Sequence, residues 1–256
     1  MENVVRNDPL LEEKYTFFSN NPYDAEYFMQ YIYGFICDKG DHVIDVGAHS
    51  AIHTIPLSTF VGGRGSVYSF EAIPYLCNRL NKLYKNKYIF HDNVKVFNVA
   101  LTNYDIAAKN KFIDFNHVCD LEGYSGIVLR PDAKSCKIEK INVQCAALDN
   151  IIQVNNTIKF IKIDVEGGDF DVLRGARRIL STSKSVVIFE SGRQYAADMY
   201  SYSKSDFFEF FEELGYELFT YTGERFTEDM WDSRYCYWET WAIHRESPYL
   251  KFFSEK

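Results

Sequence analysis

One segment constrains the fold of this 256-residue chain more than any other. Residues 158–165 are rich in β-branched and aromatic side chains, as a buried strand is, and Asp164 and Glu166 place two carboxylates at the end of that run. Two glycines follow, and apolar side chains then recur at helical spacing over 170–180. Carboxylates at the carboxyl end of a strand, beside a turn where the backbone comes close, predict a ligand site in an open α/β sheet.

The same alternation of strand and helix runs through most of the chain. We predict strands at 42–46, 66–70, 94–99, 141–146, 158–165, 185–190, 216–221 and 237–244, with two short ones at 111–115 and 126–129. We predict helices at 23–37, 51–60, 75–84, 170–180 and 206–214. Strands that alternate with helices indicate an α/β, Rossmann-like fold: a mostly parallel sheet with helices on both faces and an antiparallel edge formed by the last strands.

The domain organisation that follows is simple. Residues 1–40 form a helical N-terminal lead-in, and residues 41–256 form a single domain, because no Pro/Ser-rich linker and no internal repeat divides them. Pro56 is expected in or near the first turn of its helix, where its missing N–H is tolerated. Ser205 is the expected N-cap of the helix over 206–214, and Gly215 its C-terminal stop.

Charge and cysteine usage exclude several classes of protein. The net charge is −8, and no run of Lys and Arg approaches a nucleic-acid footprint, so a nucleic-acid partner is not expected. No stretch of 18 apolar residues and no signal-peptide core is present, so neither a membrane span nor export is expected. The six cysteines are scattered without a CxxC pair. This pattern favours reduced thiols in a cytoplasmic protein over disulfides or a zinc site.

Aromatic residues make up 17% of the chain. One interpretation is a core built largely from Phe and Tyr. The other is that some of the Tyr and Trp side chains form a platform for a flat or sugar-like substrate, because their rings stack on apolar faces while the polar tip hydrogen-bonds.

The turn after the first predicted strand indicates a cofactor. Asp45 and Gly47 end that strand, and the helix beyond can hydrogen-bond an anionic group at its N-terminus. Glu71 ends the next strand, where an acid can hold both hydroxyls of a ribose. A dinucleotide-binding motif would require further glycines directly after Gly47, and residues 48–51 contain none. The amino-acid end of S-adenosylmethionine suits Asp45 better.

These motifs, taken in order, resemble the FkbM-type S-adenosylmethionine-dependent methyltransferases. The resemblance covers roughly residues 41–190 and is carried by Asp-Val-Gly-Ala at 45–48, Tyr-Ser-Phe-Glu at 68–71, Asn-Val-Ala-Leu at 98–101, Leu-Asp at 148–149 and Lys-Ile-Asp-Val-Glu-Gly at 162–167. It implies the seven-stranded class I methyltransferase fold and O-methylation, often of a sugar or natural-product hydroxyl. It also implies a set of cofactor-binding residues: Asp45, Gly47, Ala48, His49, Glu71, Ala72, Val99, Ala100 and Asp164.

The chain departs from the family at its first motif. The family has Asn, an apolar residue and Gly where this chain has His49, Ser50 and Ala51. His49 retains hydrogen-bonding atoms. Ala51 replaces the glycine without strain only if its φ angle is negative.

The acids at the strand ends are the candidate catalytic residues. Asp164 and Glu190 end strands that are expected to be neighbours, so their tips lie about 5 Å apart. They could hold a divalent cation, Mg or Mn, that binds the acceptor oxygen, or one of them could act as a base. Glu166 either takes part in catalysis or caps the following helix. Asp169 is expected to serve only as an acid in the first turn of that helix.

Taken together, the sequence predicts an S-adenosylmethionine-dependent O-methyltransferase that acts on a hydroxyl of a sugar or glycan. Three alternatives stay open. The acceptor is a non-sugar natural product, or the chain is a nicotinamide-dependent oxidoreductase, or it is a non-catalytic binding module with a methyltransferase fold. The expected partner is a small-molecule or glycan acceptor, and the oligomeric state is open.

Overall fold

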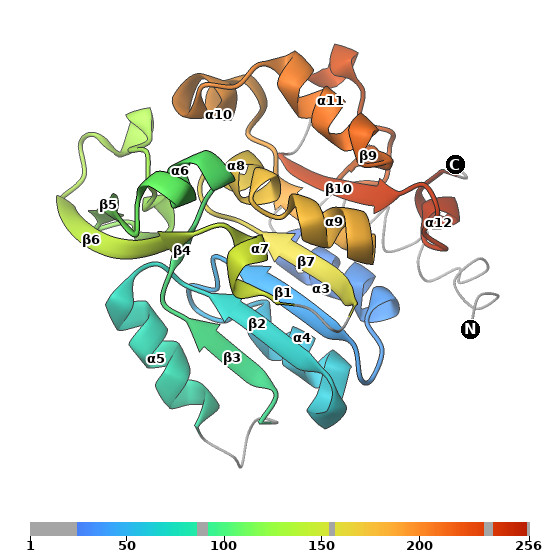
Figure 1. Cartoon of the computed structure of the whole chain (residues 1–256), viewed down its shortest axis with the longest axis horizontal. Helices are drawn as coiled ribbons and strands as arrows, with labels where there is room; N and C mark the ends of the chain where they lie inside the picture. Colours follow the sequence, from blue (N-terminus) through green and yellow to red (C-terminus); the bar gives the residue numbers. More distant parts are fainter. Residues whose placement is uncertain (1–24, 86–91, 154–156, 233–237, 255–256) are drawn as a thin grey trace.

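A seven-stranded sheet forms the centre of the molecule in a computed structural model that describes residues 25–85, 92–153, 157–232 and 238–254 (Figure 1). The strands lie in the order β3 (Val94–Phe97), β2 (Ser66–Phe70), β1 (His42–Val46), β7 (Ile158–Ile163), β8 (Val186–Glu190), β10 (Glu239–His244) and β9 (Tyr216–Thr220). The first five run parallel, and β10 is antiparallel to both of its neighbours. The expected α/β fold with an antiparallel edge is therefore confirmed.

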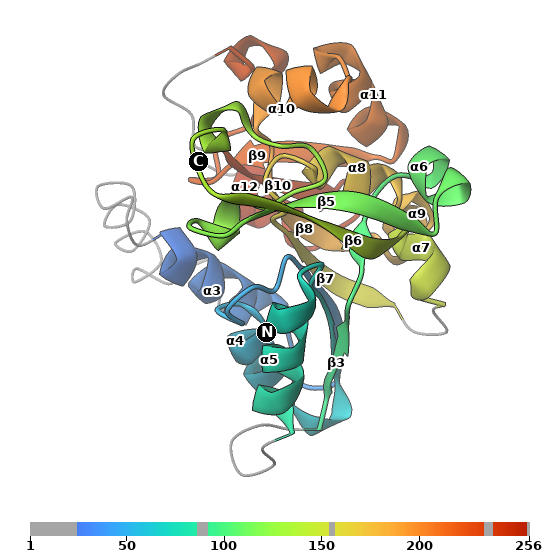
Figure 2. The same ribbon diagram turned by 90° about the vertical axis from the view of Figure 1, so that its left-hand side faces the viewer.

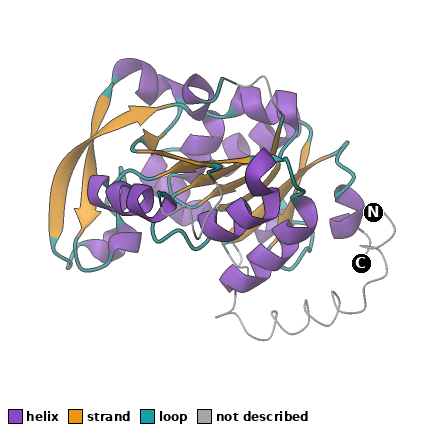
Figure 3. Ribbon diagram, turned by 90° about the horizontal axis from the view of Figure 1, so that it is seen from below, coloured by secondary structure: helices purple, strands orange, loops and turns teal. Residues whose placement is uncertain are grey.

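Helices cover both faces of this sheet (Figure 3). One face packs against α3 (Ala25–Ile36), α4 (Thr54–Val61) and α12 (Leu250–Ser254). The other packs against α7 (Leu148–Ile151), α8 (Asp169–Arg174), α9 (Arg177–Ser183) and α11 (Lys204–Glu213). Buried side chains alternate between the two faces along a strand, as in β8, where Ile188 faces the first set of helices and Phe189 the second.

A smaller sheet is inserted between β3 and β7. It consists of β4 (Ala100–Leu101), β6 (Ile138–Ala146) and β5 (Phe112–Val118), with α6 (Tyr104–Lys109) and two short turns, η3 (Glu122–Tyr124) and η4 (Pro131–Ala133). We call residues 100–146 the insert. Its long strands project beyond the central sheet, as Figures 1 and 2 show, and they cross in front of the strand ends below α10 (Arg193–Tyr200).

The chain order creates a crevice at a defined place. From β1 the chain proceeds outward through β2 and β3, and it returns to the other side of β1 with β7 and β8. In open α/β sheets the ligand binds at the carboxyl ends of the strands where the order reverses, which here is between β1 and β7. α5 (Pro74–Tyr84) follows β2, and its Leu76 packs against the insert on that side.

Three predicted helix boundaries are corrected. The helix predicted over 51–60 is α4, which begins only at Thr54 because Ala51 has a φ angle of 70°. Pro56 lies in its first turn, as expected. The helix predicted over 170–180 is divided into α8 and α9. The N-cap of α11 is Ser203 rather than Ser205, since Ser203 and Asp206 form a reciprocal capping box.

Several predicted strands also differ in length. The run over 158–165 ends at Ile163 in β7, and β6 begins at Ile138, before the predicted start at 141. Residues 126–129 form no strand but one isolated bridge, between Gly126 and Asn116. Residues 1–24 of the predicted lead-in and Tyr237 of the last predicted strand lie outside the described residues. Within the described ranges, every helix is too short or too polar to cross a membrane.

Candidate active site

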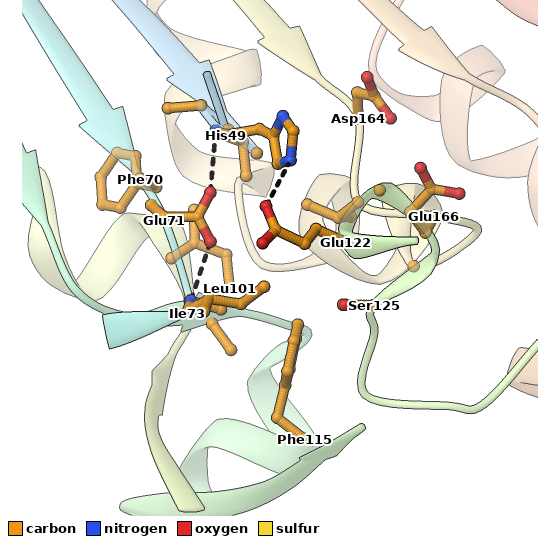
Figure 4. Close-up of a pocket in the computed structure, with 18 of the residues that line it drawn as sticks. His49, Phe70, Glu71, Ile73, Leu101, Phe115, Glu122, Ser125, Asp164 and Glu166 are labelled. Atoms are coloured by element: carbon orange, nitrogen blue, oxygen red, sulfur yellow. Dashed lines mark hydrogen bonds and ion pairs between the residues drawn. The ribbon is translucent and has the colours of Figure 1, made fainter. Parts of the chain in front are cut away.

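A cavity of about 290 Å³ opens at the carboxyl ends of β1, β2 and β7 (Figure 4). It occupies the position where the strand order reverses. One end, which we call the Glu71 end, is bordered by Glu71, Ile73 and Phe115. The other, the Asp164 end, is bordered by Asp164 and Glu166.

Gly47 fixes the floor of the cavity by a close approach of two turns. Its φ angle is 77°, and a Cβ at this position would lie 1.8 Å from the carbonyl oxygen of Asp164. The N–H groups of Gly47 and Ala48 both donate to the Phe70 carbonyl at 3.0 Å, and the Asp164 N–H donates to the Val46 carbonyl at 3.1 Å. The ends of β1, β2 and β7 are therefore joined through the main chain, and only glycine fits at position 47.

Glu71 is buried and anchored at both carboxylate oxygens. One oxygen accepts the N–H of His49 at 2.8 Å, and the other accepts the N–H of Ile73 at 2.8 Å. Burial raises the pKa of Glu71, and these two hydrogen bonds oppose the shift. Each oxygen of a carboxylate has a second lone pair, so Glu71 can still accept hydrogen bonds from a ligand.

Apolar side chains complete the Glu71 end. They come from the turn after β2, from the segment after β3 and from the insert: Ala72, Ile73, Val99, Ala100, Leu101, Phe115 and Ile127. Asn98 holds the first two of these segments together, because its side-chain amide donates to the carbonyl oxygens of Glu71 and Ala72, both at 2.9 Å. The result is a narrow apolar slot that ends in a carboxylate, which suits a flat heterocycle bearing a ribose.

A buried lysine lies beneath the Asp164 end. The Nζ of Lys162 donates to Asp164 at 3.1 Å and lies 4.0 Å from a carboxylate oxygen of Asp45. Burial alone would lower the pKa of Lys162, but Asp164 and Asp45 raise it, so the ammonium is retained. Burial likewise acts to raise the pKa of Asp164, and Lys162 overrides it and holds the pKa below its usual value.

Asp45 does not line the cavity. It is fully buried and accepts a hydrogen bond from the hydroxyl of Thr54, in the first turn of α4. Its other carboxylate oxygen lies 4.0 Å from the Nζ of Lys162, which does line the cavity. The structure places Asp45 as the counter-charge of Lys162.

Glu166 faces the cavity from a strained turn. Its φ angle is 57°, and Arg130 of the insert forms an ion pair with its carboxylate. Arg130 also donates two hydrogen bonds of 3.2 Å to Asp132, and its guanidinium lies 4.4 Å from the centre of the Tyr124 ring. Burial and then Asp164 raise the pKa of Glu166 to about 7, against the opposing effect of Arg130.

Glu190 follows Phe189, the partner of Ile163 in the β7–β8 ladder, but it is not one of the residues that line the cavity. Burial, Asp164 and Asp169 raise its pKa to about 9, so it is protonated at neutral pH. Asp169 is buried between the two strand ends, and it accepts the N–H of Glu190 at 3.1 Å and that of Val165 at 3.4 Å. It therefore does more than the helix acid we expected: it ties β8 to the turn after β7.

The pair formed by Asp164 and Glu190 does not fit a divalent cation. The Asp164 carboxylate already has the Lys162 ammonium as its counter-charge at 3.1 Å. Glu190 does not line the cavity, so the pair does not offer two carboxylates to an ion there. Of the two alternatives left by the sequence, a base therefore fits these residues better than a metal.

S-adenosylmethionine fits the cavity better. The residues that would hold it are Glu71 for the ribose, the apolar slot for the adenine, and the turn at Gly47, which lines the cavity between the two ends. Ala48, His49, Ala72, Val99, Ala100 and Asp164 also line the cavity, so the structure brings together every predicted cofactor residue except Asp45.

Several lining residues have no counterpart in the sequence-based prediction. Glu26 comes from α3, Glu122 and Ser125 from the insert, and Tyr200 from the end of α10. These positions are far apart in the chain, and no local motif marks them. Lys162 is different, because residues two apart in a strand point to the same face of the sheet. The position of Lys162 two residues before Asp164 therefore indicates in the sequence that the two side chains are neighbours.

Two histidines connect these new residues to the first motif. His49 has a φ angle of 43°, and its Nε2 lies 3.5 Å from a carboxylate oxygen of Glu122. His53 is buried, lies 3.2 Å from the hydroxyl of Tyr33 and forms an ion pair with Glu26. The φ angles of 43° at His49 and 70° at Ala51 explain why the family has Asn and Gly there; the negative φ that we required at Ala51 is not found.

Comparisons with known proteins agree with this geometry. The model of the FkbM methyltransferase domain matches residues 45–218. Among curated protein sequences, none matches this chain.

Solved structures with a similar fold share little sequence with it. Methyltransferase FkbM from Methylobacillus flagellatus KT has 17% identity and a TM-score of 0.46, over 81% of this chain and 44% of that one, so this chain spans less than half its length. An S-adenosylmethionine-dependent O-methyltransferase from Thermotoga maritima has 12% identity and a TM-score of 0.45, over 86% of this chain and 64% of that one. Fibrillarin from Aeropyrum pernix with bound S-adenosylmethionine has 12% identity and a TM-score of 0.43, over 80% of this chain and 67% of that one.

These structural similarities are too low to transfer the activity of any of the three proteins. The family model is stronger, because it spans more than half of the chain and includes the turns at Gly47, Glu71 and Asp164. The chain therefore belongs to the FkbM family of S-adenosylmethionine-dependent methyltransferases.

Proposed function

We propose that this chain binds S-adenosylmethionine at the Glu71 end of the cavity and methylates a hydroxyl of a sugar or glycan at the Asp164 end. The observation that carries the proposal is the contrast between the ends. The Glu71 end is an apolar slot with one carboxylate. The Asp164 end has three lining carboxylates, those of Glu26, Asp164 and Glu166, and a further one, Glu122, lies between the two ends (Figure 4).

Carboxylates accept hydrogen bonds but donate none, so a group of them selects a ligand rich in donors. A polyhydroxylated ring is such a ligand. A cationic acceptor is less well matched, because Lys162 already compensates Asp164 and Arg130 already compensates Glu166. The geometry thus favours hydroxyl donors over amines.

When bound, S-adenosylmethionine supplies an electrophilic methyl group. Transfer to a hydroxyl then requires a group that accepts the hydroxyl proton as the new bond between oxygen and carbon forms. Glu166 suits this role, since it faces the cavity and its pKa of about 7 lies near working pH. Arg130 holds its carboxylate in place. The contact with Lys162 holds the pKa of Asp164 below its usual value, and this supports a role for the ionised Asp164 in orienting the acceptor.

The proposal is tested with the full chain in two steps. Calorimetry with S-adenosylhomocysteine measures binding to the wild type, Glu71→Gln and Glu166→Gln. Transfer of a radiolabelled methyl group to a panel of free sugars, glycans and small natural products then measures activity. Glu213→Gln is the control, because Glu213 also pairs with an arginine but lies on the surface.

We expect Glu71→Gln to weaken binding at least about 10-fold, since it replaces a charged hydrogen-bond acceptor. Glu166→Gln should keep wild-type binding and lose at least about 100-fold in rate. If S-adenosylhomocysteine does not bind, or if nicotinamide nucleotides raise the melting temperature instead, the methyltransferase proposal is refuted. Binding without methyl transfer to any acceptor would favour a binding module, and transfer only to non-sugar acceptors would refute the sugar assignment.

A further inference from the structure

Three metal-ligating side chains lie together on the insert, outside the cavity. His117 of β5 is directly opposite Glu139 of β6 in the antiparallel ladder. Cys119 follows two residues later on the same side, and its N–H continues the ladder to the Lys137 carbonyl at 2.8 Å. One imidazole nitrogen, the Cys119 sulfur and one carboxylate oxygen of Glu139 all lie within 4.8 Å of one another.

The donor set and its spacing suit zinc. Imidazole, thiolate and carboxylate are the three ligand types that zinc uses in proteins. A tetrahedral ion with ordinary bond lengths places its nitrogen and sulfur ligands about 3.6 Å apart. The Nδ1 of His117 and the Sγ of Cys119 are 3.9 Å apart, so a small side-chain rotation is sufficient.

No strong interaction among the described residues explains why these groups converge. The thiol of Cys119 has only long contacts, of 3.9 Å, with the His117 ring and the His117 carbonyl. The other ring nitrogen of His117, Nε2, is buried and has no hydrogen-bond partner in the part of the chain that the structure describes. Glu139 has an exposed contact of 3.9 Å with Lys137, a surface pair that contributes little and is easily displaced.

We propose that His117, Cys119 and Glu139 form a zinc site that fastens β5 to β6, with water as the fourth ligand. The scattered cysteines and the absence of a CxxC pair gave no sign of zinc in the sequence. That spacing rule applies to ligands in one loop, whereas these ligands come from two paired strands.

The proposed zinc site also braces one wall of the cavity. The His117 ring lies 5.7 Å from the ring of Tyr75, and the Tyr75 hydroxyl donates to Glu122. Phe115, two residues before His117 in β5, lies in the cavity wall. Fixing His117 therefore fixes the part of the insert that lies over the Glu71 end.

Cobalt provides the direct test, because thiolate-bound Co²⁺ has a charge-transfer absorption in the near ultraviolet. The full chain is stripped of metal with a chelator, dialysed and titrated with Co²⁺ alone. We expect one equivalent to give this absorption in the wild type. Cys119→Ser should abolish it, His117→Ala should weaken cobalt binding at least about 10-fold, and Glu139→Gln should weaken it less. Cys136→Ser is the matched control, since Cys136 is another free cysteine of the insert.

The melting temperature with zinc is a second measurement, and it does not depend on the absorption of cobalt. Zinc at saturating concentration should raise the melting temperature of the wild type and of Cys136→Ser, but not that of Cys119→Ser. Circular dichroism shows whether each variant is folded. Absence of the cobalt absorption in the wild type, or its persistence in Cys119→Ser, would overturn the proposal. Neither result depends on S-adenosylhomocysteine binding, so the zinc site and the proposed activity fail separately.

Discussion

The two ends of the cavity are built in different ways. At the Glu71 end, short runs of consecutive residues are held by main-chain hydrogen bonds, and Glu71 itself receives two backbone N–H groups. At the Asp164 end, charged side chains from α3, β7, the turn after β7 and the insert compensate one another. The first end depends on backbone shape and the second on the balance between charged side chains, so they should respond to different substitutions.

The largest expected effect is at the backbone junction. Gly47→Ala combines a φ angle of 77° with a collision against the Asp164 carbonyl, and we expect a loss of more than about 3 kcal/mol in the free energy of unfolding. Gly40→Ala is the control, because Gly40 has a φ angle of 104° but open space around it. It should lose only about 1 kcal/mol. Chemical denaturation measures both, and equal losses would show that the junction is not close-packed.

The next effect is at the Asp164 end. Lys162→Met leaves Asp164 and Asp45 without their shared counter-charge, which should destabilise the protein by about 3–5 kcal/mol. Lys159→Met on the same strand removes a contact with the Tyr249 ring, and we expect less than about 1 kcal/mol. Adding Asp164→Asn to Lys162→Met should recover part of the loss. No recovery would show that Lys162 acts through packing alone.

These predictions show which parts of the site were accessible from the sequence. The turns at Gly47 and Glu71 were predictable, because each is a strand end followed by a helix within a few residues. The roles of Asp45 and Glu190 were not, because whether a strand-terminal acid faces a cavity or a neighbouring charge depends on packing. Helix boundaries failed where backbone angles were unusual, as at Ala51.

The stability of the protein should also depend on pH, through acids at the ends of β7 and β8. The pKa of Glu190 is raised in the folded state to about 9, so the native protein binds more protons than the unfolded one between about pH 4.5 and 9. Stability is therefore greatest below that window and falls as the pH rises through it. Asp169 has a pKa raised to about 8 and contributes in the same direction. Its contribution ends at a lower pH than that of Glu190, because its pKa is lower.

Glu190→Gln should flatten this dependence, most clearly between pH 8 and 9, and should raise the melting temperature there by at least about 2 °C. Differential scanning calorimetry from pH 5 to pH 9 measures it, with Glu213→Gln as a surface control. An unchanged slope in Glu190→Gln would mean that Glu190 is ionised in the folded protein.

The smallest effect is expected at Ala51. Ala51→Gly relieves a left-handed φ angle, worth about 1 kcal/mol, but loses a buried methyl group of similar value. The net change should lie within about 1 kcal/mol of zero. Ala48→Gly in the same cluster loses a buried methyl without this relief, so it should be the more destabilising by about 1 kcal/mol. Equal losses would show that position 51 is unstrained.

The sequence by itself determined the alternation of strands and helices, and with it the parallel sheet and the turns of the Glu71 end, because hydrophobic period and turn residues act over a few positions. Tertiary structure alone decided that Lys162 also faces Asp45, that Arg130 of the insert holds Glu166, and that Glu26 reaches the cavity. It also brought His117, Cys119 and Glu139 together across two strands. Electrostatic partners are set by distance in space, and strand pairing brings together residues that no local pattern connects.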